Sequence, residues 1–525
     1  MAEEESLQET KNESLEDPES ELSERKKIEN YVKQHCLQEF LDEAINKVVE
    51  DRPGNPYLHL AQFMETKTLP EIMDLKLNCC IISRGLVGVQ AILTTNFSTF
   101  ESSFPISNYN DSTEGDMLID FAVIQSKTKE ALRGTDPTKT EEIDDLILGV
   151  KGMSSPIAMA VSIACARAGA RHSGKPLHIF LSEQIGSTCR LPVPVVSLLT
   201  RAVGGSIKVN QSITAIPTTP SFLDNAMEAM MHAVQAVHSK LDERANAEEG
   251  EAGEVVCTVY ETGCPCVSNK VPLLDAIKLV KDALSDGGIE GTPKIGLDFR
   301  ACDLTLKPQA TEEGEIPYED QPALQYQLNG DNDNVLTAEE IGDVIGPLWR
   351  ETELISIEDP ISASDTAVDQ YQDKIDGIIT DIKSSESGDL RYNLDQGVGG
   401  DPNCSLQVVA DRPCTSVEDV ELVSHPFNAI KVSLNKCGGT VTKALKLCQA
   451  VNDAKMTLIV GCLEGMPESP DAFAADLAVA TGAYQFSGGG LGAVEYACKY
   501  ARLLEIARDF DDIRFASKNF RNKDT

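Results

Sequence analysis

The 525-residue chain has one tryptophan, seven histidines, and only 46 basic residues against 84 acidic ones. No apolar run approaches the roughly 20 residues that a membrane-spanning helix needs, and the first residues are acidic rather than basic and then apolar. We therefore expect neither a secreted nor a membrane-spanning protein. The formal net charge of −38 argues against a nucleic-acid partner, because phosphate contacts need Lys and Arg to displace counterions.

Paired cysteine motifs are also missing from the chain. The 15 cysteines are scattered, without two CxxC motifs at the spacing of a zinc site or a regular disulfide framework. The pairs Cys79–Cys80 and Cys264/Cys266 could form metal or redox sites. Small buried thiols in a reducing compartment are the simpler interpretation, and this favours a cytoplasmic protein.

The amino-terminal part of the chain changes character twice. Residues 1–25 are rich in Glu and Ser with almost nothing to bury, which predicts an acidic disordered tail. Apolar residues then recur at helical spacing over 26–69, interrupted by the breaker Asp51-Arg-Pro-Gly-Asn-Pro56. Two short helices around such a turn resemble the docking and dimerisation domain of the protein kinase A regulatory subunit. That resemblance implies a helical module that binds an amphipathic helix; a hairpin packed on the rest of the protein is the alternative.

Residues 70–190 have the pattern of a small mixed domain. Apolar residues alternate from Leu75 to Gln90, which predicts a strand. Helical spacing follows over 115–132 and over 156–171, where the second segment is rich in alanine.

From residue 191 to 515, apolar runs alternate with helical segments, which favours a parallel α/β barrel. An open doubly wound sheet is the alternative, but Gly488–Gly490 lacks the full spacing of a nucleotide-binding turn. Residues 516–525 are expected to form a short tail. The predicted strands are 193–199, 210–215, 294–298, 353–357, 406–410, 428–432 and 457–461.

Three acidic residues each follow an apolar strand. They are Asp298 in KIGLD, Glu358 in ISIEDP and Asp411 in QVVAD, and a further strand carries Lys431 near its end. Reacting groups of parallel barrels gather at the carboxyl ends of the strands. Three carboxylates there would repel one another unless a hard cation such as Mg²⁺ lay between them. A lysine facing the same cavity is placed to act as a general base.

The segments LPVP, KIGLD, SIEDP, IKVSLNKCGG and FAADLAVATG resemble, in order and spacing, the barrel of the enolase family. Upstream, Ile82-Ser-Arg-Gly85 resembles the first loop of the enolase amino-terminal domain. The resemblance implies an α/β fold with an α+β capping domain over 70–190, a TIM-like barrel over 191–515 and an added helical extension. With that extension the chain looks closest to the enolase 4 type of sperm and other motile cells.

The resemblance implies a role for several residues of this chain. It gives Asp298, Glu358 and Asp411 as ligands of one Mg²⁺, and Ser83 as a ligand of a second. It gives Lys431 as the base that removes the α-proton of 2-phosphoglycerate. The two carboxylates that assist the leaving hydroxide correspond to Gln211, which is no acid, and to Glu261.

Other family positions are substituted in this chain. The loop histidine is missing from Ala202–Ser206, and the phosphate-gripping run corresponds to Leu463–Met466, where Glu464 would repel a phosphate. Ser487 stands in place of the second lysine. One interpretation is a divergent, weak phosphopyruvate hydratase that forms a homodimer. The alternative is an impaired enolase that serves as a scaffold, for example in a cilium or flagellum; a related acid substrate without phosphate is a lesser possibility.

Overall fold

The computed structural model divides the chain into two units, Met1–Leu69 and Pro70–Thr525. No helix in the described ranges is long and apolar enough to cross a membrane. The structure describes residues 18–67, 69–106, 121–202, 209–247, 255–256, 263–289, 293–305, 324–327, 335–362, 406–422, 427–463, 466–510, 513–516 and 520–521.

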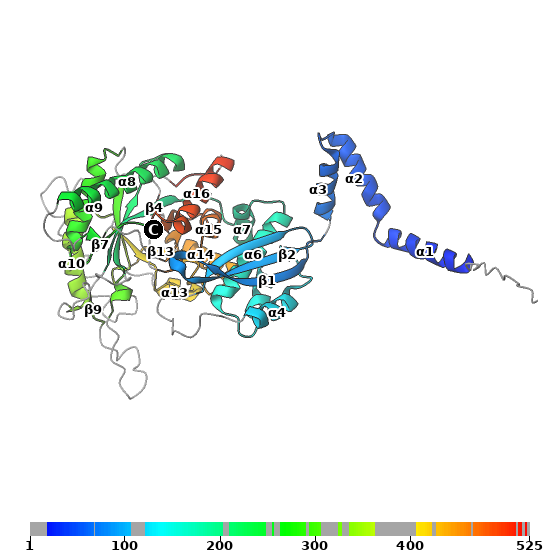
Figure 1. The fold of residues 1–525 in the computed structure, drawn as a ribbon, viewed down its shortest axis with the longest axis horizontal. Coiled ribbons are helices and arrows are strands. Elements are labelled where there is room, and N and C mark those ends of the chain that lie inside the picture. Colours follow the sequence, from blue (N-terminus) through cyan, green and yellow to red (C-terminus); the bar gives the residue numbers. More distant parts are fainter. Residues whose placement is uncertain are drawn as a thin grey trace, which may run out of the picture. The chain divides into compact units, whose positions relative to one another are not determined.

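The described part of the first unit consists of the helices α1 (Pro18–Gln34), α2 (Leu37–Asp51) and α3 (Pro56–Lys67) (Figure 1). Helix α1 therefore begins inside the segment that its composition predicts to be disordered. The left-handed backbone of Cys36 separates α1 from α2, a break that the apolar spacing does not reveal. Helices α2 and α3 pack through the stacked rings of Phe40 and Phe63, whose centroids are 5.7 Å apart.

The second unit begins with an antiparallel sheet of β1 (Ile72–Ile81), β2 (Val87–Thr95) and β3 (Thr99–Pro105). The alternation that predicts one strand over 75–90 is thus a hairpin, with the turn η1 (Ser83–Gly85) between its strands. Gly85 has a positive φ of 70°, which suits glycine at this tight turn. Four helices follow: α4 (Phe121–Leu132), α5 (Thr140–Leu148), α6 (Ser155–His172) and α7 (Leu177–Ile185).

The barrel is a closed sheet of eight strands. The fifteenth strand pairs with the fourth, so the sheet has no free edge there and the open doubly wound alternative is excluded. Strand β5 runs antiparallel to both of its neighbours, and the remaining pairs are parallel. In spatial order the strands are β4 (Val193–Ala202), β5 (Val209–Ile216), β8 (Lys294–Asp298), β11 (Ser356–Glu358), β12 (Gln407–Ala410), β13 (Ala429–Ser433), β14 (Thr457–Gly461) and β15 (Gln485–Gly489).

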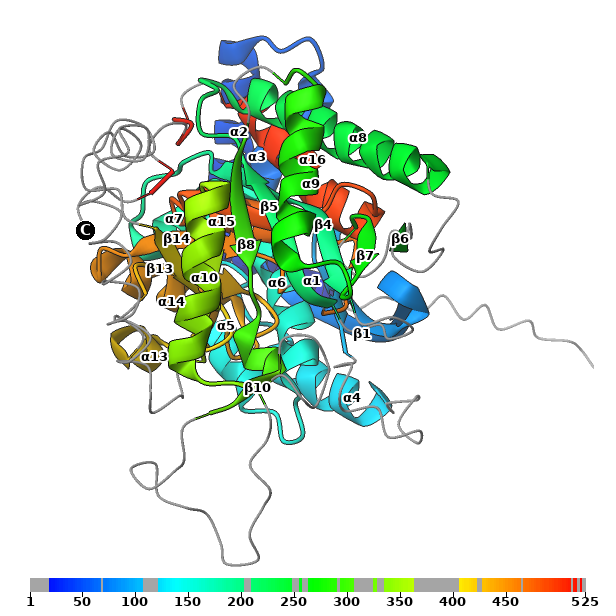
Figure 2. The ribbon, with the colours of Figure 1, turned by 90° about the vertical axis from the view of Figure 1, so that its left-hand side faces the viewer.

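Helices cover the outside of the barrel, as Figures 1 and 2 show. Short strands β6 (Val255–Val256) and β7 (Cys266–Ser268) extend the sheet beyond β4, and β9 (Tyr326–Gln327) pairs with β10 (Val335–Leu336). The covering helices are α8 (Leu223–Ala247), α9 (Leu273–Asp286), α10 (Ala338–Thr352), α13 (Val417–Leu422), α14 (Val441–Asp453), α15 (Phe473–Ala480) and α16 (Val494–Asp509).

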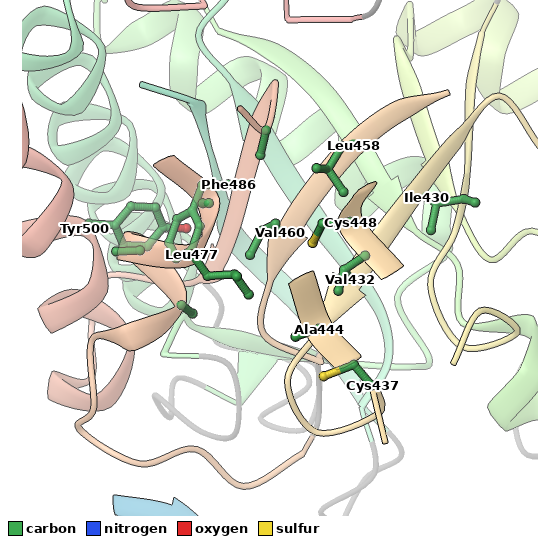
Figure 3. Packing of buried hydrophobic residues seen from close by; sticks show 14 of the residues in the cluster. Ile430, Val432, Cys437, Ala444, Cys448, Leu458, Val460, Leu477, Phe486 and Tyr500 are labelled. Carbon is green, nitrogen blue, oxygen red and sulfur yellow. The ribbon is translucent and has the colours of Figure 1, made fainter. Parts of the chain in front are cut away.

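Strand alternation decides which residues face the barrel axis. Ile430 and Val432 of β13 belong to the hydrophobic layer that also holds Ala444 and Cys448 of α14 (Figure 3). Successive side chains of a strand point to opposite faces. Lys431, which stands between Ile430 and Val432, therefore points into the barrel.

Polar contacts fasten the sheet and helices of 70–185 to the barrel. Arg167 of α6 donates two hydrogen bonds to Asp471, which follows β14, at 2.6 and 2.9 Å. The hydroxyl of Ser162 accepts from the backbone N–H of Val441 at the start of α14. Since the first N–H groups of a helix have no partner inside that helix, this contact stabilises the start of α14.

Candidate active site

Three carboxylates lie together at one end of the barrel. Asp298 ends β8 and Glu358 ends β11, and the two residues are direct partners across this parallel pair. Asp411 follows the last residue of β12, which pairs with β11 on its other side. The apolar strands thus deliver all three acids to the same rim. Asp298 and Asp411 are fully buried.

Lys431 of β13 reaches into this cluster. Its Nζ donates to Oε1 of Glu358 at 2.6 Å and lies 3.1 Å from Oδ2 of Asp411. The side chain is completely buried. A buried ammonium needs such partners, because an unpaired charge in the interior is costly. The structure therefore brings four of the residues predicted from the sequence into one cluster.

A fourth carboxylate, Asp359, holds the backbone beneath this cluster. Its left-handed backbone, with φ 43°, turns the chain immediately after Glu358. Its two carboxylate oxygens accept from the backbone N–H groups of Asp411 and Arg412, at 2.9 and 3.1 Å. Arg412 Nη1 also donates to Asp359 at 3.1 Å. Asp359 therefore fixes where Asp411 points, a role that the sequence motif EDP does not by itself reveal.

The surroundings shift the pKa values of the three carboxylates in different directions. Burial raises the pKa of Asp298 to about 7, although Arg412, Lys431 and Arg300 oppose the shift. Burial likewise raises the pKa of Glu358 well above its usual range, against the effect of Lys431. Burial would also raise the pKa of Asp411, but the nearby cations hold it below its ordinary value.

The unsatisfied oxygens indicate where a cation would fit. Both carboxylate oxygens of Asp298 are buried without a hydrogen-bond partner in the described part of the chain. No three His, Cys, Asp or Glu side chains among the described residues enclose a metal position by themselves. Mg²⁺, however, is often held by one or two carboxylates, with water and substrate completing its shell. Asp298 and Glu358 fit such an ion, with Lys431 on one oxygen of Glu358, whereas both carboxylate oxygens of Asp411 lie beside lysines. Of the two cysteine pairs, Cys264 and Cys266 are buried as expected, whereas Cys79 is exposed, so the expectation of a buried thiol is wrong there.

Comparison with known proteins agrees with this arrangement. Residues 405–524 match the family described as the enolase C-terminal TIM barrel domain. The chain is also similar to cytosolic enolase 3 of Arabidopsis thaliana, with 25% identity over 515 residues that cover 92% of this chain and 97% of the relative. The chain is therefore similar to enolases along almost its whole length, and its carboxyl-terminal part matches the barrel domain of that family. Its barrel, with acids at three strand ends, is the fold that the sequence predicts, but the antiparallel second strand differs from the parallel arrangement expected.

Ser83, which the resemblance to enolases gives as the first-loop serine, contacts the segment after β14. Its hydroxyl accepts from the backbone N–H of Glu468 at 3.0 Å, and its own N–H donates to the carbonyl of Glu468 at 3.2 Å. The side chain of Glu468 in turn accepts from Asn435, 3.3 Å away. Within the described residues, these bonds tie the first loop to the turn after β13 rather than to the carboxylates.

Gln211 points away from the carboxylates. Its Oε1 accepts from Arg201 of the neighbouring strand at 2.5 Å, and Arg201 also donates to two backbone carbonyls. The next residue, Ser212, lies directly opposite Asp298 in the β5–β8 register. Since neighbours on a strand face opposite sides, Ser212 shares the inner face with Asp298. Thr214 also lines the barrel interior. Because alternate residues of a strand share a face, counting back two positions from Thr214 would have identified Ser212 as an inner residue.

The remaining enolase positions carry little positive charge. Cys462 and Leu463 follow β14 as buried apolar residues. Ser487 of β15 lines the barrel interior together with Asp298 and Glu358. Glu261 and Glu464, as well as the predicted loop 203–206, lie outside the described residues.

Proposed function

We propose that this chain is a Mg²⁺-dependent lyase that slowly converts 2-phosphoglycerate to phosphoenolpyruvate and water, in the cytoplasm and as a homodimer. The observation that supports this function is the position of Lys431. Its ammonium nitrogen lies between Glu358 and Asp411 at the barrel rim. A base must stand within hydrogen-bond reach of the proton it removes, and the rim of a barrel is where substrates bind.

In this proposal the Lys431 ammonium first loses a proton to solvent, and the neutral Nζ then accepts the α-proton of the substrate. Asp298 and Glu358 hold a Mg²⁺ ion, with Asp411 as a further ligand, and Ser83 is proposed for a second ion. Bound Mg²⁺ would stabilise the negative charge that develops on the substrate carboxylate when the proton leaves. Asp359 keeps Asp411 and Arg412 in place through its bonds to their backbone N–H groups.

Slow turnover follows from the groups that surround the proposed base. Neither Gln211 nor Ser212 can donate a proton as a carboxylic acid does, so Glu261 is proposed for that step. Loss of one general acid costs about 10²–10⁴-fold in rate. The absence of an arginine from the end of β14 removes a charge-assisted contact to phosphate, which is worth about 1.5–3 kcal/mol.

The test is phosphoenolpyruvate formation from 2-phosphoglycerate and Mg²⁺ by the purified full-length protein. We expect slow product formation that Lys431→Ala abolishes. The matched control is Lys443→Ala, which changes an exposed lysine on α14 and should leave the rate unchanged. Product formation no faster than in the Lys431 variant would contradict the proposal.

A second candidate function is a catalytically impaired enolase that acts as a structural component, for example of a cilium or flagellum. The observation that favours it is an apolar stripe on α2, formed by Leu41, Ile45 and Val49, which are 44%, 54% and 63% exposed. Surface apolar residues in one row are typical of a surface that binds another helix. The resemblance to the enolase 4 type stays a prediction.

A further inference from the structure

Lys436 occupies an unusual position beside the carboxylate cluster. It lies in the turn after β13, where its backbone N–H donates to the carbonyl of Ser433 at 3.0 Å. This turn folds the chain back over the strand ends. The side chain of Lys436 is 10% exposed, and its Nζ donates to both the backbone carbonyl and Oδ1 of Asp411.

Both carboxylate oxygens of Asp411 therefore face an ammonium group. Lys436 contacts Oδ1, and Lys431 lies 3.1 Å from Oδ2. Asp298 differs sharply, since neither of its oxygens has a hydrogen-bond partner in the described ranges. Arg412 Nη1 approaches Asp298 Oδ1 only to 3.9 Å. The cluster thus has one carboxylate with two close cations beside another that has none within bonding distance.

We propose that Lys436 is a competing cation that sets the affinity of this site for a divalent metal ion. The inference rests on the proposed Mg²⁺ site and deepens it. A metal ion on Asp298 and Glu358 gains Asp411 as a further ligand only when the Lys436 ammonium leaves Oδ1. Two cations cannot share that oxygen without strong repulsion, because like charges at short range in a buried site interact strongly. Coordination of the metal ion by Asp411 Oδ1 and the Lys436–Asp411 ion pair therefore exclude each other, and the ion is bound less tightly while the pair persists.

The experiment is a calorimetric Mg²⁺ titration of the full-length protein. Lys436→Met removes the competing charge and keeps the length of the side chain. We expect this variant to bind Mg²⁺ at least about tenfold more tightly than the wild type, a gain of about 1.4 kcal/mol. Lys443→Met removes an exposed lysine from the adjoining helix and should not change the affinity. An affinity that is equal or weaker in the Lys436 variant would overturn the inference.

A second measurement on the wild-type protein keeps the inference testable even if Lys436→Met fails to fold. Lysines are labelled by reductive ¹³C-methylation, and the Lys436 signal is assigned by its absence from Lys436→Arg. Mg²⁺ should shift this signal as the ammonium leaves Asp411. A signal that stays in place while calorimetry detects binding contradicts the inference.

The Asp298→Ala variant tests the proposed lyase function separately from the inference about Lys436. If Mg²⁺ binding is lost in Asp298→Ala but unchanged in Lys436→Met, the proposed lyase function stands and only the competition by Lys436 is refuted. Mg²⁺ binding that is absent from every variant, or that persists without Asp298, refutes both.

Discussion

Arg167 and Asp471 stand 304 residues apart in the chain and form a two-bonded ion pair between α6 and the segment after β14. The same Asp471 accepts from the backbone N–H of Ser103 in β3 at 3.1 Å. One carboxylate thus holds a helix and a strand of the amino-terminal sheet domain against the barrel.

Removing this pair should loosen the sheet domain. Arg167→Met leaves Asp471 largely buried without its partner, and we expect a loss of about 1–2 kcal/mol in the free energy of unfolding. Amide hydrogen exchange should accelerate in β3 more than in β13. Arg133→Met, at an exposed position, is the control. Uniform exchange across both strands would show that the pair does not fasten the domain.

The ion pair between buried Asp476 and half-buried Arg502 should make stability depend on acid pH. Burial would raise the pKa of Asp476, but two hydrogen bonds of 2.9 Å from Arg502, together with His178, hold it below its usual value. A depressed folded-state pKa stabilises the fold above pH 4 and loses this effect as the pH falls through that pKa. Asp476→Asn should cost about 1–3 kcal/mol at pH 7 and progressively less below pH 4. Urea unfolding at several pH values measures this; a constant difference between variant and wild type would refute it.

The contact between Gln211 and Arg201 can be tested by substituting Gln211. The guanidinium is 2% exposed, and burial lowers its pKa to about 10. Gln211 Nε2 has no hydrogen-bond partner in the described part of the barrel. Gln211→Glu replaces that donor with a carboxylate facing Arg201, so we expect a gain of about 1–2 kcal/mol in stability.

The neighbouring variant Ser212→Glu provides the control for this prediction. It places its charge on the inner face opposite Asp298, where repulsion between carboxylates should lower the melting temperature. Thermal unfolding of both variants distinguishes the two faces of β5. If both substitutions shift the melting temperature in the same direction, the assignment of faces is wrong.

The apolar stripe of α2 should contribute to association. Ile45→Glu puts a charge at its centre, and we expect this change to weaken self-association of the full-length protein by at least about tenfold, because a charge is poorly tolerated inside an apolar contact. Sedimentation equilibrium measures the effect. Met231→Glu alters a comparably exposed apolar residue, 47% against 54%, on α8 of the barrel. Equal dissociation constants for the two variants would leave the stripe without this role.

Much of the barrel and its rim follows from local pattern. Asp298, Glu358 and Asp411 each follow a short apolar run, so their meeting at one rim needed only the rule that parallel strands end together. Strand β15 was harder to predict, because Gly488 and Gly489 weaken a strand pattern.

The features that local pattern misses depend on pairing at long range or on a single step of register. Gln211 and Ser212 are adjacent in the sequence, yet their side chains face opposite sides of β5. In the sequence, nothing distinguishes Lys436 from the other charged residues, because only the turn after β13 brings it to Asp411. The hairpin of β1 and β2 reads as one strand because η1 interrupts the alternation only briefly.

Closure of the barrel has a consequence for synthesis of the protein. Strand β4 pairs with β15 on one side, so this edge of β4 has no barrel neighbour until β15 is made. The carbonyl of Val195 likewise accepts from the hydroxyl of Tyr500, which lies 305 residues later in the chain. During translation the first strands therefore leave the ribosome long before the last ones exist, and they expose an unpaired apolar edge throughout. Contacts this distant in sequence also form slowly. The growing chain therefore keeps this edge open to pairing with other chains until its carboxyl-terminal strands arrive.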